Sequence, residues 1–250
     1  MTSETAGPFE GIPREAVDFL RALARNNDTA WFDRHRPEYD SYVVEPMRRL
    51  VREFSDWMNA EVDAGIESRP QVGRAIGRIR RDTRFSRDKR PYKETVWIIF
   101  RNRRAVMTTL GFYWELTTTG YLYGMGFYSA PPRVLRAVRE RALAEPAKFR
   151  EAIAPIGARP ELRASGEPYR RSSMPGAPED LRFWLDRKNL YVGASRPHDD
   201  VLHSRALVDL VWDAWDGLVP LYRFLRDSSS GSYRGPPEEA GAPGRRGPRR

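Results

Sequence analysis

The chain has 250 residues, 40% of them hydrophobic and 12% aromatic, and it contains no cysteine. This length and apolar content suffice for one large packed domain or two small ones. The lack of cysteine excludes disulfides, zinc–thiolate sites and cysteine nucleophiles. Residues 1–9 are polar and no run of about 18 apolar residues occurs, so we expect neither a signal peptide nor a membrane span, and a soluble, cytoplasmic protein.

Positive charge is concentrated in one segment of the chain. The net charge is +9, and residues 69–104 alone hold 13 lysines and arginines against three acids. The rest of the chain is nearly neutral, with 30 cations against 31 acids. A local positive field of this kind attracts phosphates, nucleic acids and acidic small molecules.

The N-terminal third is predicted to be helical. A first helix begins after Pro13, and a second helix, capped by Asp28 or Thr29, stops near Pro37. A third and longer helix opens at residues 45–46. The apolar faces of the first and third helices are formed by Val17, Leu20, Leu23 and Ala24, and by Met47, Leu50, Val51, Phe54 and Met58.

The middle of the chain changes to the period of strands. Residues 96–100, 105–117 and 121–128 are rich in β-branched and aromatic side chains, and residues 117–120 read as a turn. The short connections favour an antiparallel meander. Residues 74–80 indicate a further strand that leads into the basic segment.

The strand at 121–128 has two different faces. Gly124 and Gly126 alternate with four large side chains: Tyr121, Tyr123, Met125 and Phe127. Two glycines on one face let another element or a ligand approach the backbone closely. The pattern favours a packed helix over a ligand there.

Helices return in the C-terminal part. We expect helices that begin at residues 131–132 and at 146, a loop over 162–178 and a short helix over 178–187. A strand at 190–194 and a final long helix with an apolar face over 207–218 follow. This order predicts an α+β fold with N-terminal helices, a central, mainly antiparallel sheet and C-terminal helices. The expected divisions are a flexible lead (1–8), a single domain (9–227) and a disordered tail (228–250).

The densest part of the basic segment is residues 80–93. Its seven cations are Arg80, Arg81, Arg84, Arg87, Lys89, Arg90 and Lys93, and its two acids are Asp82 and Asp88. Arginine grips a phosphate or carboxylate with two parallel hydrogen bonds, and lysine offers a point charge. The candidate anion-binding residues are Arg81, Asp82, Arg84, Ser86, Lys89, Tyr92 and Lys93.

These candidates have distinct expected roles. The arginines and lysines would hold the anion, and Asp82 would orient an arginine or act as a base. Ser86 would donate its hydroxyl, and Tyr92 would offer a flat ring. Two acids cannot neutralise seven cations, so an external anion would relieve the repulsion between them.

A purely structural interpretation of the segment is the alternative. Asp82 would then pair with Arg84 or Arg80 to orient a loop, and the residues after Phe85 would form a turn. Under either interpretation, Phe85 and Tyr92 are expected to anchor the segment in the core.

The chain resembles a bacterial and fungal family called domain of unknown function 2461, over about residues 9–226. The resemblance rests on Phe9, Gly11, Phe19-Leu20, Asn26-Asn27, Trp31-Phe32, Tyr39, the run 81–86, Asp88-Lys89, residues 91–93 and the glycine-rich run 124–128. Glu94-Thr95 and the tail after Ser228 depart from the family pattern. The family has no established activity, so the resemblance supports the fold and leaves the function open.

The sequence contains only weak indications of metal binding, of a phosphate-binding loop or of a catalytic nucleophile. The three histidines, His35, His198 and His203, are scattered, so we predict no metal site. No phosphate-binding loop or nucleophile motif occurs, so the sequence assigns neither a catalytic residue nor a cofactor. Glu115 lies between apolar neighbours and is expected on the solvent side of the meander, with a buried carboxylate as the alternative.

Three functions are compatible with this sequence. The first is binding of an anionic small molecule, including a phosphorylated one, or a reaction on it. The second is a nucleic-acid-binding module, and the third is a domain that meets an acidic protein partner. The first is our leading hypothesis. The sequence does not indicate an oligomeric state.

Overall fold

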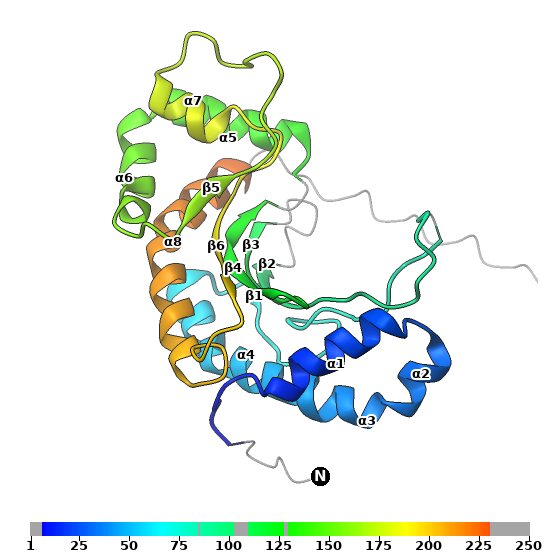
Figure 1. Cartoon of the computed structure of the whole chain (residues 1–250). Helices are drawn as coiled ribbons and strands as arrows, with labels where there is room; N and C mark the ends of the chain where they lie inside the picture. Colours follow the sequence, from blue (N-terminus) through cyan, green and yellow to red (C-terminus); the bar gives the residue numbers. More distant parts are fainter. Residues whose placement is uncertain (1–6, 85, 103–109, 128–129, 231–250) are drawn as a thin grey trace, which may run out of the picture.

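The computed structural model describes residues 7–84, 86–102, 110–127 and 130–230. It confirms the predicted α+β fold with N-terminal helices, a six-stranded antiparallel sheet and C-terminal helices; the last two strands alternate with the C-terminal helices along the chain. In Figure 1 the described part has the outline of a C: α5 and α7 lie beyond one end of the sheet, and α1, α2 and α3 lie beyond the other. Among the described residues, no helix combines the length and apolar character needed to cross a membrane.

The first two helices follow the predicted pattern. Helix α1 (Arg14–Arg25) buries Val17, Leu20 and Leu23. Helix α2 (Thr29–Arg34) is capped by Asp28, whose carboxylate accepts a hydrogen bond from Trp31 N at 2.8 Å. That bond satisfies one of the N–H groups that a helix start leaves without a partner.

The chain stays helical beyond the predicted stop at Pro37. Pro37 occupies the first turn of a new helix, and four helical elements then follow without a break: α3 (Arg36–Glu38), the π-helix η1 (Tyr39–Val44), α4 (Glu45–Trp57) and the π-helix η2 (Met58–Val62). Pro46 has no N–H to donate. The π-helix η1 ends directly before α4, and its wider turn changes the hydrogen-bonding pattern at that point. The helical path therefore continues through Pro46. All five residues of the predicted apolar face of α4 and its extension are buried.

The sheet contains the predicted meander. Its strand order is β1-β2-β3-β4-β6-β5, with every neighbouring pair antiparallel. The strands are β1 (Ile66–Glu67), β2 (Val96–Asn102), β3 (Leu110–Leu116), β4 (Gly120–Phe127), β5 (Arg163–Ser165) and β6 (Tyr191–Pro197). Strand β5 lies inside the region expected to be a loop. The predicted positions 105–109 and 128 lie outside the described residues.

The expected strand at 74–80 is not a regular strand. The segment makes an isolated bridge between Ile76 and Ile98, flanked by hydrogen bonds from Ile99 N to Ala75 O and from Gly77 N to the carbonyl of the facing tryptophan. It therefore extends the edge of β2 beside β1, but bends away too soon to form a ladder.

Helix α8 (Ala206–Ser230) covers one face of the sheet. The ring of Trp215 on this helix lies 5.6 Å from that of Phe100 and 5.9 Å from that of Phe112, between centroids. The four large residues predicted on one face of β4, Tyr121, Tyr123, Met125 and Phe127, are fully buried against this side. The other C-terminal helices are α5 (Pro132–Ala144), α6 (Pro146–Gly157) and α7 (Glu179–Leu185), as predicted.

The opposite face of the sheet, here called the open face, has half-buried side chains. They are Trp97, Ile99 and Arg101 on β2, Tyr113 and Glu115 on β3, and Leu122 on β4. Glu115, expected on the solvent side of the meander, lies on this face and is half-buried, between the two alternatives.

The two glycines of β4 accommodate a strand rather than the expected helix. A Cβ atom on Gly124 would lie 2.2 Å from the carbonyl oxygen of Val192, and one on Gly126 would lie 2.4 Å from Cα of Tyr191. Both neighbours belong to β6. The predicted close approach to these glycines is present, and the element that approaches them is the neighbouring strand β6.

The N-terminal segment meets the turn that precedes α8. Ile12 N donates to Leu202 O at 3.0 Å. Phe9 N and the guanidinium of Arg205 both bond to the carboxylate of Glu53, at 3.1 and 2.8 Å. The N-terminal segment is thereby attached to the turn that precedes α8.

Candidate functional site

The basic segment forms a short two-stranded ribbon, here called the basic arm (residues 79–93). Arg81 N donates to Pro91 O at 2.8 Å and Lys93 N donates to Ile79 O at 2.9 Å, on either side of a bridge between Arg80 and the residue after Pro91. Figure 1 shows this segment extending away from the body of the protein on the open side of the C. Phe85, expected to be a core anchor, lies outside the described residues.

Tyr92 anchors the arm to the N-terminal helices, as predicted. Its side chain is 3% exposed and its ring stacks on Phe32 at a centroid distance of 4.1 Å. The ring therefore offers no free flat surface to a ligand, which corrects the role expected for it.

Asn27 completes this anchor and was missed in the sequence as a site residue. Its Nδ2 donates to Tyr92 O and its Oδ1 accepts from Tyr92 N, both at 3.0 Å. The carboxamide thus pairs with the backbone as a neighbouring strand would. The only sequence signal was the pair Asn26-Asn27 at the end of α1, which indicated a helix stop.

The first acid of the arm pairs locally. Asp82 accepts three side-chain hydrogen bonds from Arg84, the shortest at 2.7 Å, and one from Arg84 N. The side-chain hydrogen bond from Arg84, with the backbone bond, lowers the pKa of Asp82 to about 2. Asp82 thus pairs with Arg84, as the structural interpretation of the segment predicted.

The second acid joins the two strands of the arm. Asp88 bonds to Arg90 at 2.7 Å and to Arg81 at 3.1 Å, and Arg90 also pairs with Glu94. The side-chain hydrogen bond from Arg90 is the main reason why the pKa of Asp88 lies well below its usual range. Ser86 Oγ accepts from Asp88 N at 3.1 Å, which confirms the predicted turn.

Two cations lie together at the root of the arm. Lys93 Nζ donates to Arg78 O at 2.9 Å and lies 3.9 Å from the centroid of the Trp97 ring. Burial lowers the pKa of Lys93, and the nearby charge of Arg81 lowers it further. Arg81 reaches Asp88 and a backbone carbonyl, while its Nε is buried with no hydrogen-bond partner.

The remaining candidates lie at the tip. Arg84 is 77% exposed, and Lys89 Nζ donates to Thr83 O at 3.0 Å. Two further arginines, Arg87 near the tip and Arg80 at the bridge beside the root, were not among the candidates; they are exposed and make no ion pair within the described ranges. The seven predicted residues thus separate into a root, where Arg81 and Lys93 are adjacent, and a tip that is held by its own ion pairs.

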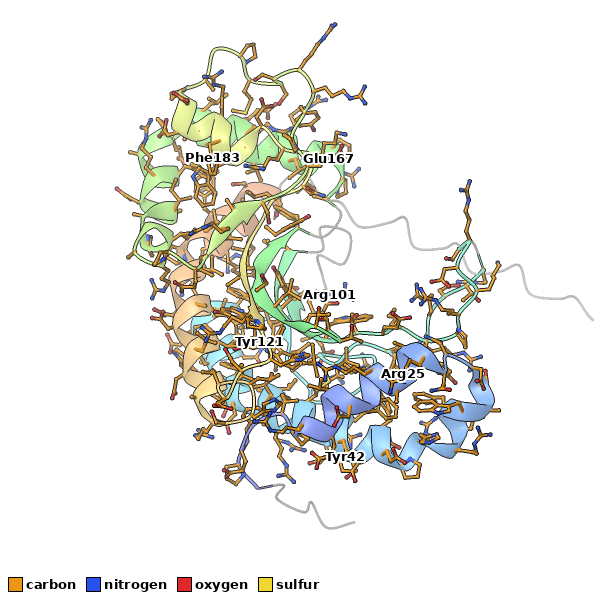
Figure 2. All side chains as sticks on the ribbon, viewed as in Figure 1. Arg25, Tyr42, Arg101, Tyr121, Glu167 and Phe183 are labelled. Carbon is orange, nitrogen blue, oxygen red and sulfur yellow. The ribbon has the colours of Figure 1, made fainter. Side chains whose placement is uncertain are left out.

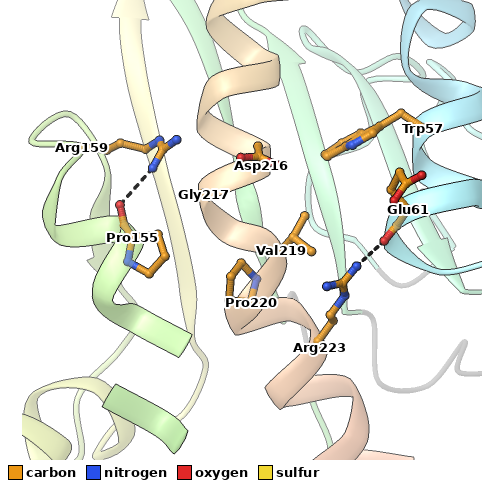
Figure 3. Close-up of a pocket in the computed structure, with 9 residues that line it drawn as sticks. All are labelled: Trp57, Glu61, Pro155, Arg159, Asp216, Gly217, Val219, Pro220 and Arg223. Carbon is orange, nitrogen blue, oxygen red and sulfur yellow. Dashed lines mark hydrogen bonds between the residues drawn. The ribbon is translucent and has the colours of Figure 1, made fainter. Parts of the chain in front are cut away.

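A separate pocket of about 320 Å³ lies between α4–η2, α6 and α8 (Figure 3). Its lining residues are Trp57, Glu61, Pro155, Arg159, Asp216, Gly217, Val219, Pro220 and Arg223. Both arginines are already engaged there, Arg159 with Asp213 and Pro155 O, and Arg223 with Glu61 O. None of the predicted site residues lines this pocket.

The three histidines lie at separate places, and a ring nitrogen of each is close to a backbone carbonyl oxygen. His35 stacks on Trp31 at 4.1 Å, a ring nitrogen of His198 lies 3.1 Å from Thr117 O, and one of His203 lies 2.6 Å from Ile12 O. Each histidine side chain thus makes a structural contact at a helix end or a turn.

Comparison with known proteins confirms the suspected family. The family described as conserved hypothetical protein (DUF2461) matches residues 15–224, which include every candidate residue of the basic arm. No curated protein matches the chain.

Proposed function

The chain belongs to the DUF2461 family, and we propose, from the site alone, that it binds an anionic, phosphate-bearing small molecule at the root of the basic arm. Lys93 and Arg81 hold the anion, and the ion-paired tip keeps the arm in shape. The family description names no reaction, so the proposal is for binding.

The arrangement of Lys93 is the observation that carries this proposal. Its ammonium group is half-buried next to a second cation, and its neighbours are a carbonyl oxygen and an aromatic ring. Burial without a carboxylate partner is costly for a charge. A phosphate placed between Lys93 and Arg81 would remove that cost and would satisfy the unpaired Nε of Arg81.

Calorimetry and thermal-shift measurements test the proposal. They compare the binding of inorganic phosphate, pyrophosphate and sugar phosphates at low and moderate salt. A ligand that binds only the folded state raises the melting temperature. We expect Lys93→Met to weaken phosphate binding at least about tenfold, because a charge-assisted hydrogen bond contributes about 1.5–3 kcal/mol. Lys148→Met is the control, since Lys148 on α6 pairs with Glu145, the residue that precedes this helix.

The same titrations separate the alternative functions. Equal phosphate affinity of Lys93→Met and the wild type would refute the proposed site. A shift produced only by oligonucleotides, and lost with salt, would favour the nucleic-acid-binding module. No response to any anion would leave an acidic protein partner as the better hypothesis.

A further inference from the structure

The ring of Tyr113 lies along the open face of the sheet. A Cβ atom on Gly124 would lie 2.9 Å from the Tyr113 hydroxyl oxygen, and one on Gly193 would lie 2.5 Å from it. Gly124 pairs with Tyr113 across β3 and β4, whereas Gly193 is one strand further away, on β6. Neighbouring strands are about 4.8 Å apart, so a β3 side chain reaches β6 only by lying along the sheet. The glycines therefore make room for a flattened ring, whose second face is turned away from the backbone.

Two cations lie on the β2 side of Tyr113. On β2, Ile99 is directly opposite Tyr113, so Trp97 and Arg101 occupy the two diagonal positions, at a typical separation of about 7–8 Å. Lys93 is bound over Trp97 on one side. On the other side lies Arg101, which Figure 2 labels on the inner side of the C and which has no ion pair in the described part of the chain.

One acid completes the surroundings of the ring. Glu115 is two residues from Tyr113 on the same face of β3 and is half-buried. Burial raises the pKa of Tyr113 to about 12, and the charges of Glu115 and Tyr191 add to the rise. The phenol is therefore neutral at physiological pH, and a hydrogen-bond acceptor lies beside it.

We propose that the phosphate held by Lys93 and Arg81 belongs to a nucleoside phosphate, whose planar base stacks on Tyr113. This proposal rests on the proposed function and extends it from an anion to a class of ligand. A flat, neutral ring that lies against two glycines suits a base of any kind. Glu115 accepts a hydrogen bond from the N–H groups of the base or from a sugar hydroxyl, and Arg101 meets a further phosphate.

Comparing AMP and GMP with ribose 5-phosphate in calorimetric titrations tests the class of ligand, because the sugar phosphate lacks only the base. Stacking of one base on an aromatic side chain corresponds to a gain of about 5- to 150-fold in affinity. We expect Tyr113→Phe to keep this gain and Tyr113→Leu to lose it, while ribose 5-phosphate binds both variants equally. Tyr42→Leu is the control for loss of an exposed aromatic side chain.

Each outcome separates the two proposals. If AMP and GMP bind no tighter than ribose 5-phosphate, the base does not stack and this inference is wrong, although the phosphate site stands. Equal nucleotide affinity of Tyr113→Phe and Tyr113→Leu, with both variants folded by circular dichroism, would also overturn it. If neither nucleotides nor ribose 5-phosphate bind, the proposed function fails together with the inference.

Discussion

Two carboxylates shape the basic arm at the scale of single residues. Asp82 and Asp88 each accept hydrogen bonds from the backbone N–H and the guanidinium of the arginine two residues later, Arg84 and Arg90 respectively. Asp88 also reaches Arg81 on the other strand of the ribbon. These bonds leave both acids occupied, so neither carboxylate neutralises Lys93 at the root of the arm.

The ion pair of Asp82 predicts an unusual titration. Its pKa in the folded protein is about 2, below the ordinary value. The contribution of the pair to the order of the arm is therefore complete above about pH 4 and is lost as the pH falls through about 2. NMR titration of the Asp82 carboxyl carbon should give a midpoint near pH 2. A midpoint close to 3.9 would show that Arg84 does not hold the carboxylate in solution.

The arm and the helices are joined by a contact between distant elements. Tyr92 uses its backbone N–H and C=O on the side of the ribbon that faces away from residues 79–81, and Asn27 satisfies both groups. Phe32 covers the ring of the same tyrosine. The orientation of the root of the arm, including Lys93, thus depends on the loop between α1 and α2.

Replacing Asn27 by alanine tests this dependence. We expect Asn27→Ala to lower the free energy of unfolding by about 1–3 kcal/mol, because it leaves the backbone N–H of Tyr92, next to a buried ring, without its partner. Hydrogen exchange at the Tyr92 amide should accelerate. Asn26→Ala is the matched control, since the Asn26 side chain is exposed and bonds to Ala22 O on its own helix. Similar denaturation midpoints for the two variants would contradict the proposed role of Asn27.

Periodic and local features were predictable, and contacts between distant segments were not. The apolar face of α4 and the alternation in β4 follow from residue spacing, and the pairing of Asp82 with Arg84 follows from proximity in the chain. The contact between Asn27 and Tyr92 spans 65 residues, and no spacing encodes it. For the same reason, residue spacing does not predict that the Tyr113 ring lies over glycines of two other strands.

At the scale of the whole molecule, one carboxylate connects the helical layer to the sheet. Asp63 follows η2 and accepts hydrogen bonds from Gly65 N, Asn102 Nδ2 and Tyr222 OH, at 2.8, 3.2 and 3.0 Å. Burial alone would raise the pKa of Asp63, but these bonds and the charge of Arg226 outweigh it and lower the pKa. Asp63 therefore links the N-terminal helices, β2 and α8.

Asp63 predicts a pH-dependent part of the global stability. Its folded pKa is below the unfolded value, so its contribution is complete above about pH 4 and is lost as the pH falls through the folded pKa. We expect Asp63→Asn to lower the free energy of unfolding by about 1–3 kcal/mol at pH 7. The difference from the wild type should shrink in urea denaturation below pH 4. The control is Asp56→Asn on the exposed side of α4, and an equal effect of both substitutions would argue against the link.

The contact between the N-terminal segment and the turn before α8 has a consequence for the order of synthesis. The partners of Phe9 and Ile12, Arg205 and Leu202, emerge from the ribosome long after α1 and α2 have been translated. The segment that precedes α1 must therefore stay unattached until the turn before α8 has been translated. A nascent chain released before residue 202 would lack this attachment, so quality control has a long interval in which to recognise it.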